Sequence, residues 1–448
     1  MLDILTEQLK IPTGNFCLSC GKFYVVVMNV LLKNVVITDA ASPYHLQKKD
    51  IFIENGIIQR IEENIPQENS EALDGKGAFI SNGWTDIFSH FSDPGKEYRE
   101  TLESGAQAAL AGGYTSVFTI ANTHPVIDNK AQVSYIVEKS KTLPVQVFPV
   151  GAVTQHADGK DLSEMYDMHQ AGAVAFSDGL NPVQSPGLFL KALQYVKAFD
   201  GILIQQPFDK SIGTFGLISE GIISTQLGLP GIPAIAEELI VQRDIELLRY
   251  TGSRLHITGI STAKSAKLIA DAKAEGLDIT CSVTPYHLYF TDEDLQSYDT
   301  NLKTMPPLRG KEDRDALRKA VADGTIDIIA SHHFPLHSDE KDVEFEYAKS
   351  GMIGLQTAYA LVQESLPELP AERIAELLYT NPASIFGLHK NEIREGVAAD
   401  LTIFNPDGKT TLTKENNKSR SGNSPLLGKT LKGKVVATIV KNHIFINK

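Results

Sequence analysis

Short apolar runs alternate with longer amphipathic stretches along most of the chain. The runs have the length of buried strands, and the stretches between them carry apolar and small residues at helical spacing. Two of these stretches, 237–252 and 262–276, end at a glycine that can close a helix. The predicted strands lie within residues 78–91, 114–122, 145–154, 173–179, 201–208, 254–261, 278–287 and 326–334. Eight strand-then-helix units in about 300 residues predict a (β/α)8 TIM barrel over residues 79–391.

The ends of the predicted strands mark the candidate site, because the chemistry of such a barrel lies at the carboxyl ends of its strands. The residues found there are His90, Asn122, Asp178, Gln205, Gln206, His256, Gly259, His287, His332 and His333.

Both flanks of the barrel alternate apolar and polar residues as strands do. Residues 28–78 include an Asn-Gly hairpin turn, and residues 392–448 continue the same pattern after a polar loop. We therefore expect a small β-sandwich domain built from both termini. The segment MNVLLKNVVITD, from Met28, resembles the first strand of a domain, so residues 1–27 are interpreted as an N-terminal extension, or as the product of an upstream start that the cell does not use.

Composition narrows the class of protein. The 448 residues carry a net charge of -13, which argues against a nucleic-acid or anionic-membrane partner. Three cysteines provide no disulfide framework and indicate a reducing cytoplasm. The start of the chain has no secretory pattern, and the apolar stretch 23–32 is too short to span a bilayer.

Long stretches of the chain resemble the dihydroorotases of the cyclic amidohydrolase family, within the amidohydrolase superfamily. The similarity runs from about residue 28 to the C-terminus. It is carried by SDPGKEYRETLESGAQAALAGGYTSV, ANTHPVIDN, FSDG, GIPAIAEELIVQRDIELL, TPYHLYFTDEDL, DTNLKTMPPLR, SGMIGLQTAY and EGVAADLTIF. The resemblance implies interconversion of dihydroorotate and carbamoyl aspartate in pyrimidine synthesis. It also implies a centre of one or two zinc ions, which would produce hydroxide and polarise the amide carbonyl.

The positions that hold zinc in this family are mostly changed. The resemblance assigns His90 and Asp178 to retained ligand positions, whereas Phe88, Gln206 and Gly259 stand where the family has histidines. His332 occupies the position of the catalytic aspartate. The chain is therefore similar to family members that lack most metal ligands.

The positions that contact substrate are also depleted. Asn122 is retained, whereas Ser92, Met305 and Leu336 replace an arginine, an asparagine and a histidine. One weak zinc site on His90, Asp178 and His332 is an alternative, because catalytic zinc needs only three protein ligands. His332 would then be a ligand and no carboxylate would remain as the base.

Each retained polar residue also has a structural interpretation. His90 and Asp178 can hydrogen-bond one another or a water, and Asn122 can fix the loop after the second strand. His332 and His333 can be hydrogen-bonded pocket histidines. The glycines and prolines of SDPG, GIPAIAEE and MPPLRG are intact, so the scaffold is kept while the site is not.

Three functions follow from this pattern. The first is a catalytically impaired homologue that acts as a structural or regulatory partner of aspartate carbamoyltransferase and forms homo-oligomers, as the resemblance implies. The second is an active cyclic amidohydrolase with a one-metal site. The third is a module that senses a pyrimidine intermediate in the emptied pocket.

Overall fold

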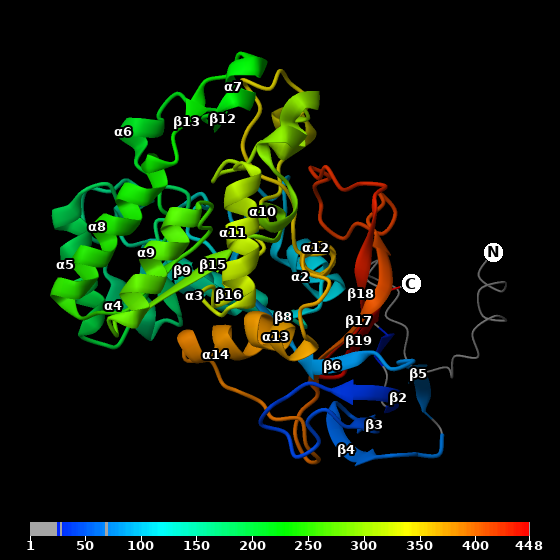
Figure 1. Cartoon of the computed structure of the whole chain (residues 1–448). Helices are drawn as coiled ribbons and strands as arrows, with labels where there is room; N and C mark the ends of the chain where they lie inside the picture. The colour runs from blue at the N-terminus through cyan, green and yellow to red at the C-terminus, as the bar shows by residue number, and fades with distance from the viewer. Residues whose placement is uncertain (1–24, 27–28, 68–69, 448) are drawn as a thin grey trace.

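The computed structural model describes residues 25–26, 29–67 and 70–447. The predicted N-terminal extension lies outside these residues, apart from the short strand β1 (Val25–Val26), which pairs with β19 (His443–Ile446). Figure 1 shows a helix-covered barrel with a separate sheet beside it, and both ends of the described chain belong to that sheet.

Within the described chain, eight parallel strands form the barrel. Its strands are β7 (Trp84–Ser89), β8 (Tyr114–Thr119), β9 (Gln146–Gly151), β10 (Ala175–Phe176), β11 (Leu203–Gln205), β14 (Leu255–Ile257), β15 (Ile279–Val283) and β16 (Ile328–Ile329). A parallel bridge between Ser89 and His333 joins the end of the first strand to the segment after the last, with His90 N donating to His333 O at 2.9 Å. The predicted fold class is confirmed: the TIM barrel is accompanied by a separate mixed β-sheet built from both termini, where the sequence pattern predicts a small β-sandwich domain.

Helices cover the outside of the barrel and lie between its strands (Figure 1). They are α2 (Leu102–Ala111), α3 (Lys130–Ser140), α4 (Met165–Gln170), α5 (Pro186–Lys197), α8 (Ile235–Thr251), α9 (Ala263–Ala274), α10 (Pro285–Tyr289), α11 (Lys311–Ala322), α12 (Ala358–Ser365), α13 (Ala371–Ala375) and α14 (Asn381–Ile385). Between β11 and α8 the chain forms an excursion of α6 (Lys210–Gly213), β12 (Ile218–Ser219), α7 (Ile222–Leu227) and β13 (Gly231–Ile232).

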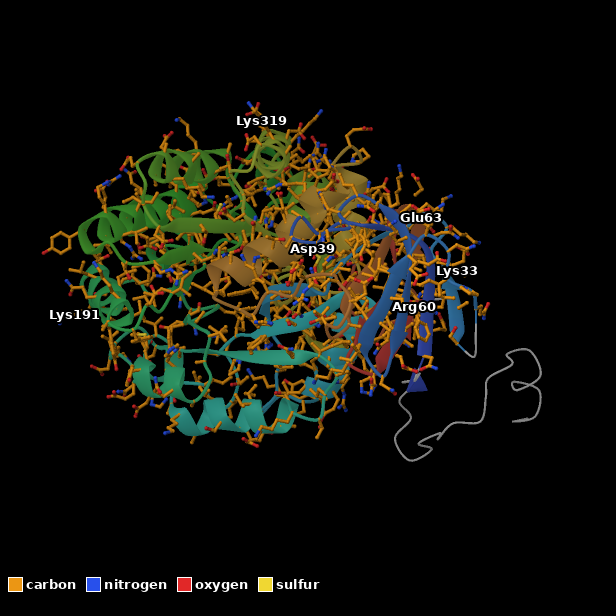
Figure 2. The ribbon with its side chains drawn as sticks, turned by 90° about the horizontal axis from the view of Figure 1, so that it is seen from below. Lys33, Asp39, Arg60, Glu63, Lys191 and Lys319 are labelled. Atoms are coloured by element: carbon orange, nitrogen blue, oxygen red, sulfur yellow. The ribbon has the colours of Figure 1, made fainter. Side chains whose placement is uncertain are left out.

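The second sheet is mixed and uses both ends of the chain. As described, its strands besides β1 and β19 are β2 (Asn29–Ile37), β3 (Lys48–Glu54), β4 (Ile57–Glu62), β5 (Glu71–Asp74), β6 (Phe79–Asn82), β17 (Asp400–Thr411) and β18 (Thr430–Val440). Figure 2 shows Lys33 and Arg60 on strands of this sheet and Asp39 and Glu63 just beyond the ends of β2 and β4, away from Lys191 and Lys319 on the barrel helices.

The chain passes from the terminal sheet into the barrel at Gly83. The sequence pattern places Phe79–Asn82 in the barrel, but β6 pairs with β2 and β17 of the terminal sheet instead. The backbone then changes partners, because Gly83 N donates to Asp400 O while Trp84 N donates to Gly113 O. A Cβ at Gly83 would lie 2.1 Å from Asp400 Oδ1, so only glycine fits this crossing.

Aromatic side chains fill the junction between the two units. Trp84, fully buried at the start of β7, lies 5.4 Å from both Phe404 of β17 and Tyr359 of α12, measured between ring centroids. Tyr114 of β8 contacts the same indole edge-on at 6.0 Å. The barrel and the terminal sheet therefore share one apolar core at this point. No helix in the described ranges is long and apolar enough to cross a bilayer.

Candidate functional site at the barrel mouth

Asp86 of β7 closes the barrel. Its Oδ1 accepts from Ser331 N at 2.6 Å, and its Oδ2 accepts from the hydroxyls of Ser89 at 2.5 Å and Ser331 at 2.9 Å. Burial raises the pKa of this carboxyl, and the hydrogen bonds from Ser89 and Ser331 oppose the shift. Both oxygens are thus used in joining the first strand to the segment after the last.

His90 has partners on both ring nitrogens. Its Nε2 lies 2.9 Å from Asn122 O, and its Nδ1 lies 2.8 Å from Ser92 Oγ. The ring packs edge-on against Phe334, with 4.8 Å between centroids. Burial lowers the pKa of His90 to about 4, so the imidazole is neutral at physiological pH. Ser92, in the position of the family's arginine, serves here as a partner of this ring.

Asp178, after β10, is held by the segment that follows β9. Thr154 donates to it twice, from N to Oδ1 at 2.9 Å and from Oγ1 to Oδ2 at 2.5 Å. Burial raises the pKa of Asp178 to about 6, although the hydrogen bonds from Thr154 favour the ionised form. Both carboxylate oxygens, which would bind metal in the family, accept hydrogen bonds from Thr154 here.

Asn122 links the segments that carry His90 and Asp178. Its backbone oxygen is bonded to His90, its Nδ2 donates to Asp178 O at 3.0 Å, and its Oδ1 accepts from Leu180 N at 3.0 Å. The structure thus brings the three residues together through the Asn122 backbone and amide. The amide side chain fixes the loop after the fourth strand.

The Asp178→Asn variant is expected to be about 1–3 kcal/mol more stable than the wild type at pH 8 and no more stable at pH 4. The folded-state pKa of Asp178, about 6, lies above the ordinary value of 3.8. The stability that its protonated form contributes is therefore full below pH 3.8 and is lost as pH rises through 6. Asparagine stays neutral throughout, and its oxygen can still accept from Thr154 N. Urea unfolding of both proteins at the two pH values measures the difference; a variant less stable at pH 8 would contradict the argument.

His332 and Phe88 form a stack in the centre of the mouth. Their ring centroids lie 4.4 Å apart with 28° between the planes. His332 Nε2 lies 2.9 Å from Thr258 Oγ1, and burial lowers the pKa of His332 to about 3. His332 is therefore a neutral, buried ring and does not replace the charged carboxylate of the family.

Gly259 lies against the same ring. A Cβ at this position would lie 2.5 Å from His332 Cε1, and the φ of Gly259 is +67°, in the left-handed region. The imidazole of His332 thus fills the space into which a side chain at position 259 would project. A histidine at position 259, which the family has, would therefore clash with the histidine that this chain has at position 332.

Gln206 is hydrogen-bonded to the loop that carries Met305. Its Nε2 donates to Met305 O at 2.8 Å, while its buried Oε1 has no partner in the described part of the molecule. Leu336, in another position that the family uses on substrate, is buried and donates from its backbone N to Asn423 Oδ1 at 3.0 Å. These residues hold loops together.

His333 belongs to a network that sequence reasoning did not identify. Gly354 N donates to its Nδ1 at 3.1 Å, so the proton is on Nε2, which lies 3.3 Å from Glu100 Oε2. Glu100 is fully buried and also accepts from Ser419 Oγ and, at 3.0 Å, from Arg420 N. Glu100 lies just before α2, and acidic residues are common at the start of a helix, so the sequence carries no signal of this role.

The other predicted strand-end residues are bound within the barrel. His256 bonds the hydroxyls of Thr280 and Ser282, His287 bonds Thr284 and Pro307 O, and Gln205 Nε2 donates to Val183 O.

The mouth does not fit the family's zinc centre. In the part of the chain that the structure describes, no group of three or more His, Cys, Asp or Glu is placed to hold a metal ion. The remaining pocket is lined mainly by aromatic and aliphatic groups, among them Phe88, Ile120, Leu180 and Phe334, and has room for about two water molecules. The donor set that two ions require is absent from these residues, since phenylalanine and glycine offer no ligand atom.

The family model and the individual relatives that match this sequence point to the same family. A family model described as dihydro-orotase-like matches residues 77–265. The chain is 41% identical to a dihydroorotase of Syntrophus aciditrophicus over 425 residues, which cover 93% of this chain and 99% of that protein. It is 42% identical to a dihydroorotase of Pelotomaculum thermopropionicum over 421 residues, with coverage of 93% and 98%.

Solved structures share the architecture. The L-hydantoinase (dihydropyrimidinase) from Arthrobacter aurescens superposes with a TM-score of 0.80 at 23% identity, covering 94% of this chain and 96% of its own. The dihydropyrimidinase from Brevibacillus agri NCHU1002 superposes with a TM-score of 0.77 at 18% identity, with coverage of 94% and 95%. At these identities the likeness concerns the fold.

Proposed function

Because the chain belongs to the dihydroorotase family, part of the amidohydrolase superfamily, we propose that it acts in pyrimidine biosynthesis as a member whose barrel no longer catalyses the reaction. The observation that carries this proposal is the stack of Phe88 on His332 against Gly259. Three positions at which the family places metal ligands or the catalytic carboxylate are occupied here by packing contacts.

The chemistry explains why this arrangement is unsuitable for turnover. Opening a cyclic amide in this family needs a hydroxide formed on metal and a carboxylate that moves the proton. His332 is neutral and bonded to Thr258, and the oxygens of Asp178 are bonded to Thr154. The other polar groups that the structure describes at the mouth bind each other and hold loops, so none of these is free to act as a base.

We propose further that the protein supports the assembly of aspartate carbamoyltransferase, as the resemblance to ligand-depleted family members implies. The closed barrel, the intact turns and the shared aromatic core around Trp84 are consistent with selection for a rigid body. Such a body supplies surfaces for association without a working site.

An active dihydroorotase is the second candidate. It is favoured by the relatives, since proteins 41% and 42% identical over nearly the whole chain are named dihydroorotase. It would require His90, Asp178 and His332 to give up their present partners and take one zinc ion. The competing hydrogen bonds at each of the three are the reason that we rank it second.

Two measurements on the purified full chain test the proposal. Supplied with zinc and either dihydroorotate or carbamoyl aspartate, the protein is expected to show no interconversion above the uncatalysed rate and to retain well under one zinc per chain. Stoichiometric zinc, with turnover that His90→Ala abolishes, would reverse the ranking.

Mixed with the aspartate carbamoyltransferase of the same organism at micromolar concentrations, the protein is expected to co-elute with it in size-exclusion chromatography. Separate peaks would contradict the partner while leaving the question of activity unaffected.

A further inference from the structure

The turn that follows β7 places two cations beside the mouth. Lys96 N donates to Ser92 O at 2.8 Å, and Arg99 N donates to Lys96 O at 2.9 Å. Ser92 in turn contacts the ring of His90, which lines the pocket. The cationic side chains of Lys96 and Arg99 therefore belong to a turn that is hydrogen-bonded to the pocket wall.

A third cation joins them from the segment after β16. Lys349 Nζ lies 2.7 Å from Glu340 Oε1, and the same carboxylate is paired with Arg99. The residues that follow Lys349, Ser350 and Gly351, line the pocket. Arg99 and Lys349 thus share the carboxylate of Glu340, and Lys96 lies close enough to feel the charges of all three. Glu97, the other carboxylate of the turn, accepts from Gly95 N at 3.0 Å.

The charges in this group are not balanced. Lys96 is partly buried and has no ion pair within the described chain, and Arg99, only 3% exposed, has a buried Nε without a partner. Burial lowers the pKa of Lys96, and the nearby Arg99 and Lys349 lower it further. The three cations Lys96, Arg99 and Lys349 stand against two carboxylates, Glu340 and Glu97, so one positive charge is in excess here, although the whole chain carries -13. Like charges held together with partial desolvation are stabilised when an anion binds between them.

We propose that Lys96 and Arg99, with Lys349 at the rim, form a binding site for a small carboxylate at the mouth of the barrel. Charge-assisted hydrogen bonds from an ammonium and a guanidinium are the usual contacts of such an anion. The site lies outside the pocket that the stack of Phe88 and His332 fills, and it does not depend on the proposed loss of catalysis.

Isothermal titration of the full chain with succinate, at fixed ionic strength and pH 7, tests the site. Succinate is expected to bind, and the neutral succinamide is not. Lys96→Gln is expected to weaken succinate binding about tenfold, because one charge-assisted hydrogen bond is lost. Lys191→Gln is the matched control, since Lys191 lies on a barrel helix away from the terminal sheet (Figure 2) and has no partner within the described residues. It is expected to bind as the wild type does.

Three results would overturn the inference: no succinate binding to the wild type, equal binding of succinamide, or equal loss in both lysine variants. Thermal unfolding of each variant without ligand checks that the fold is kept. Lys349→Gln provides a second measurement, because it removes rim charge without altering the turn at Lys96. It is expected to weaken succinate binding in the same direction.

Discussion

Replacing Gly259 by histidine, the residue that the family has at this position, is expected to lower the free energy of unfolding by about 2–4 kcal/mol. The new Cβ would lie 2.5 Å from His332 Cε1, and the residue would have to keep a φ of +67°. The ring of His332 has little room to move away, because the ring of Phe88 stacks on its face with 4.4 Å between the centroids. Urea unfolding of the wild type and the variant measures the loss.

The double variant with His332→Ala separates steric conflict from backbone strain. With the imidazole removed, the histidine at position 259 gains space, so the two substitutions together are expected to cost less than the sum of their separate effects. Additive costs would show that the contact with His332 is not the cause. A loss below about 0.5 kcal/mol for Gly259→His alone would also contradict the packing at the mouth.

Trp84→Ala is expected to destabilise the protein by about 3–5 kcal/mol, because a large cavity would replace a fully buried indole. The ring contacts Tyr114, Tyr359 and Phe404, and its Nε1 donates to Ser81 Oγ at 3.0 Å. These contacts come from the barrel, an outer helix and the terminal sheet. Loss of the indole therefore loosens all three at once.

Trp84→Phe is the matched control, since it keeps an aromatic ring and removes the hydrogen bond to Ser81. It is expected to cost clearly less than the alanine variant. Hydrogen exchange in the Trp84→Ala variant is expected to rise in β17 as well as in β7, because Phe404 loses its neighbour. Increased exchange confined to β7 would contradict a shared core.

The barrel was predictable from the sequence because each strand is a short apolar run between amphipathic helices. The crossing at Gly83 was not. The sequence pattern places residues 78–91 in one predicted strand, and the change from the terminal sheet to the barrel depends on which distant strand supplies the hydrogen bonds. The distant partner of β6 is β17, more than three hundred residues later, and local periodicity carries no information on such a pairing.

The sequence predicted which residues lie at the candidate site, but it did not predict the contacts between them. The resemblance assigns Phe88, Gly259 and His332 to the mouth, and the structure brings their rings and backbone together there. The filling of the space at Gly259 by His332 could not be derived, because it depends on side-chain directions in two strands far apart in sequence. Glu100 was missed for a similar reason, since its partners Ser419 and Arg420 follow it by more than three hundred residues.

The contact of Glu100 with the loop between β17 and β18 also bears on whether the barrel can be produced without the C-terminal strands. Asn423 of that loop donates to Phe334 O and Gly351 O at 3.0 and 3.1 Å, so the C-terminal segment is fastened directly across the mouth. In a barrel produced as residues 79–391 alone, the carboxylate of Glu100, which is fully buried in the whole chain, would be exposed to water. We therefore expect the barrel and the terminal sheet to fold as one unit, since the loop between β17 and β18 completes the rim of the barrel.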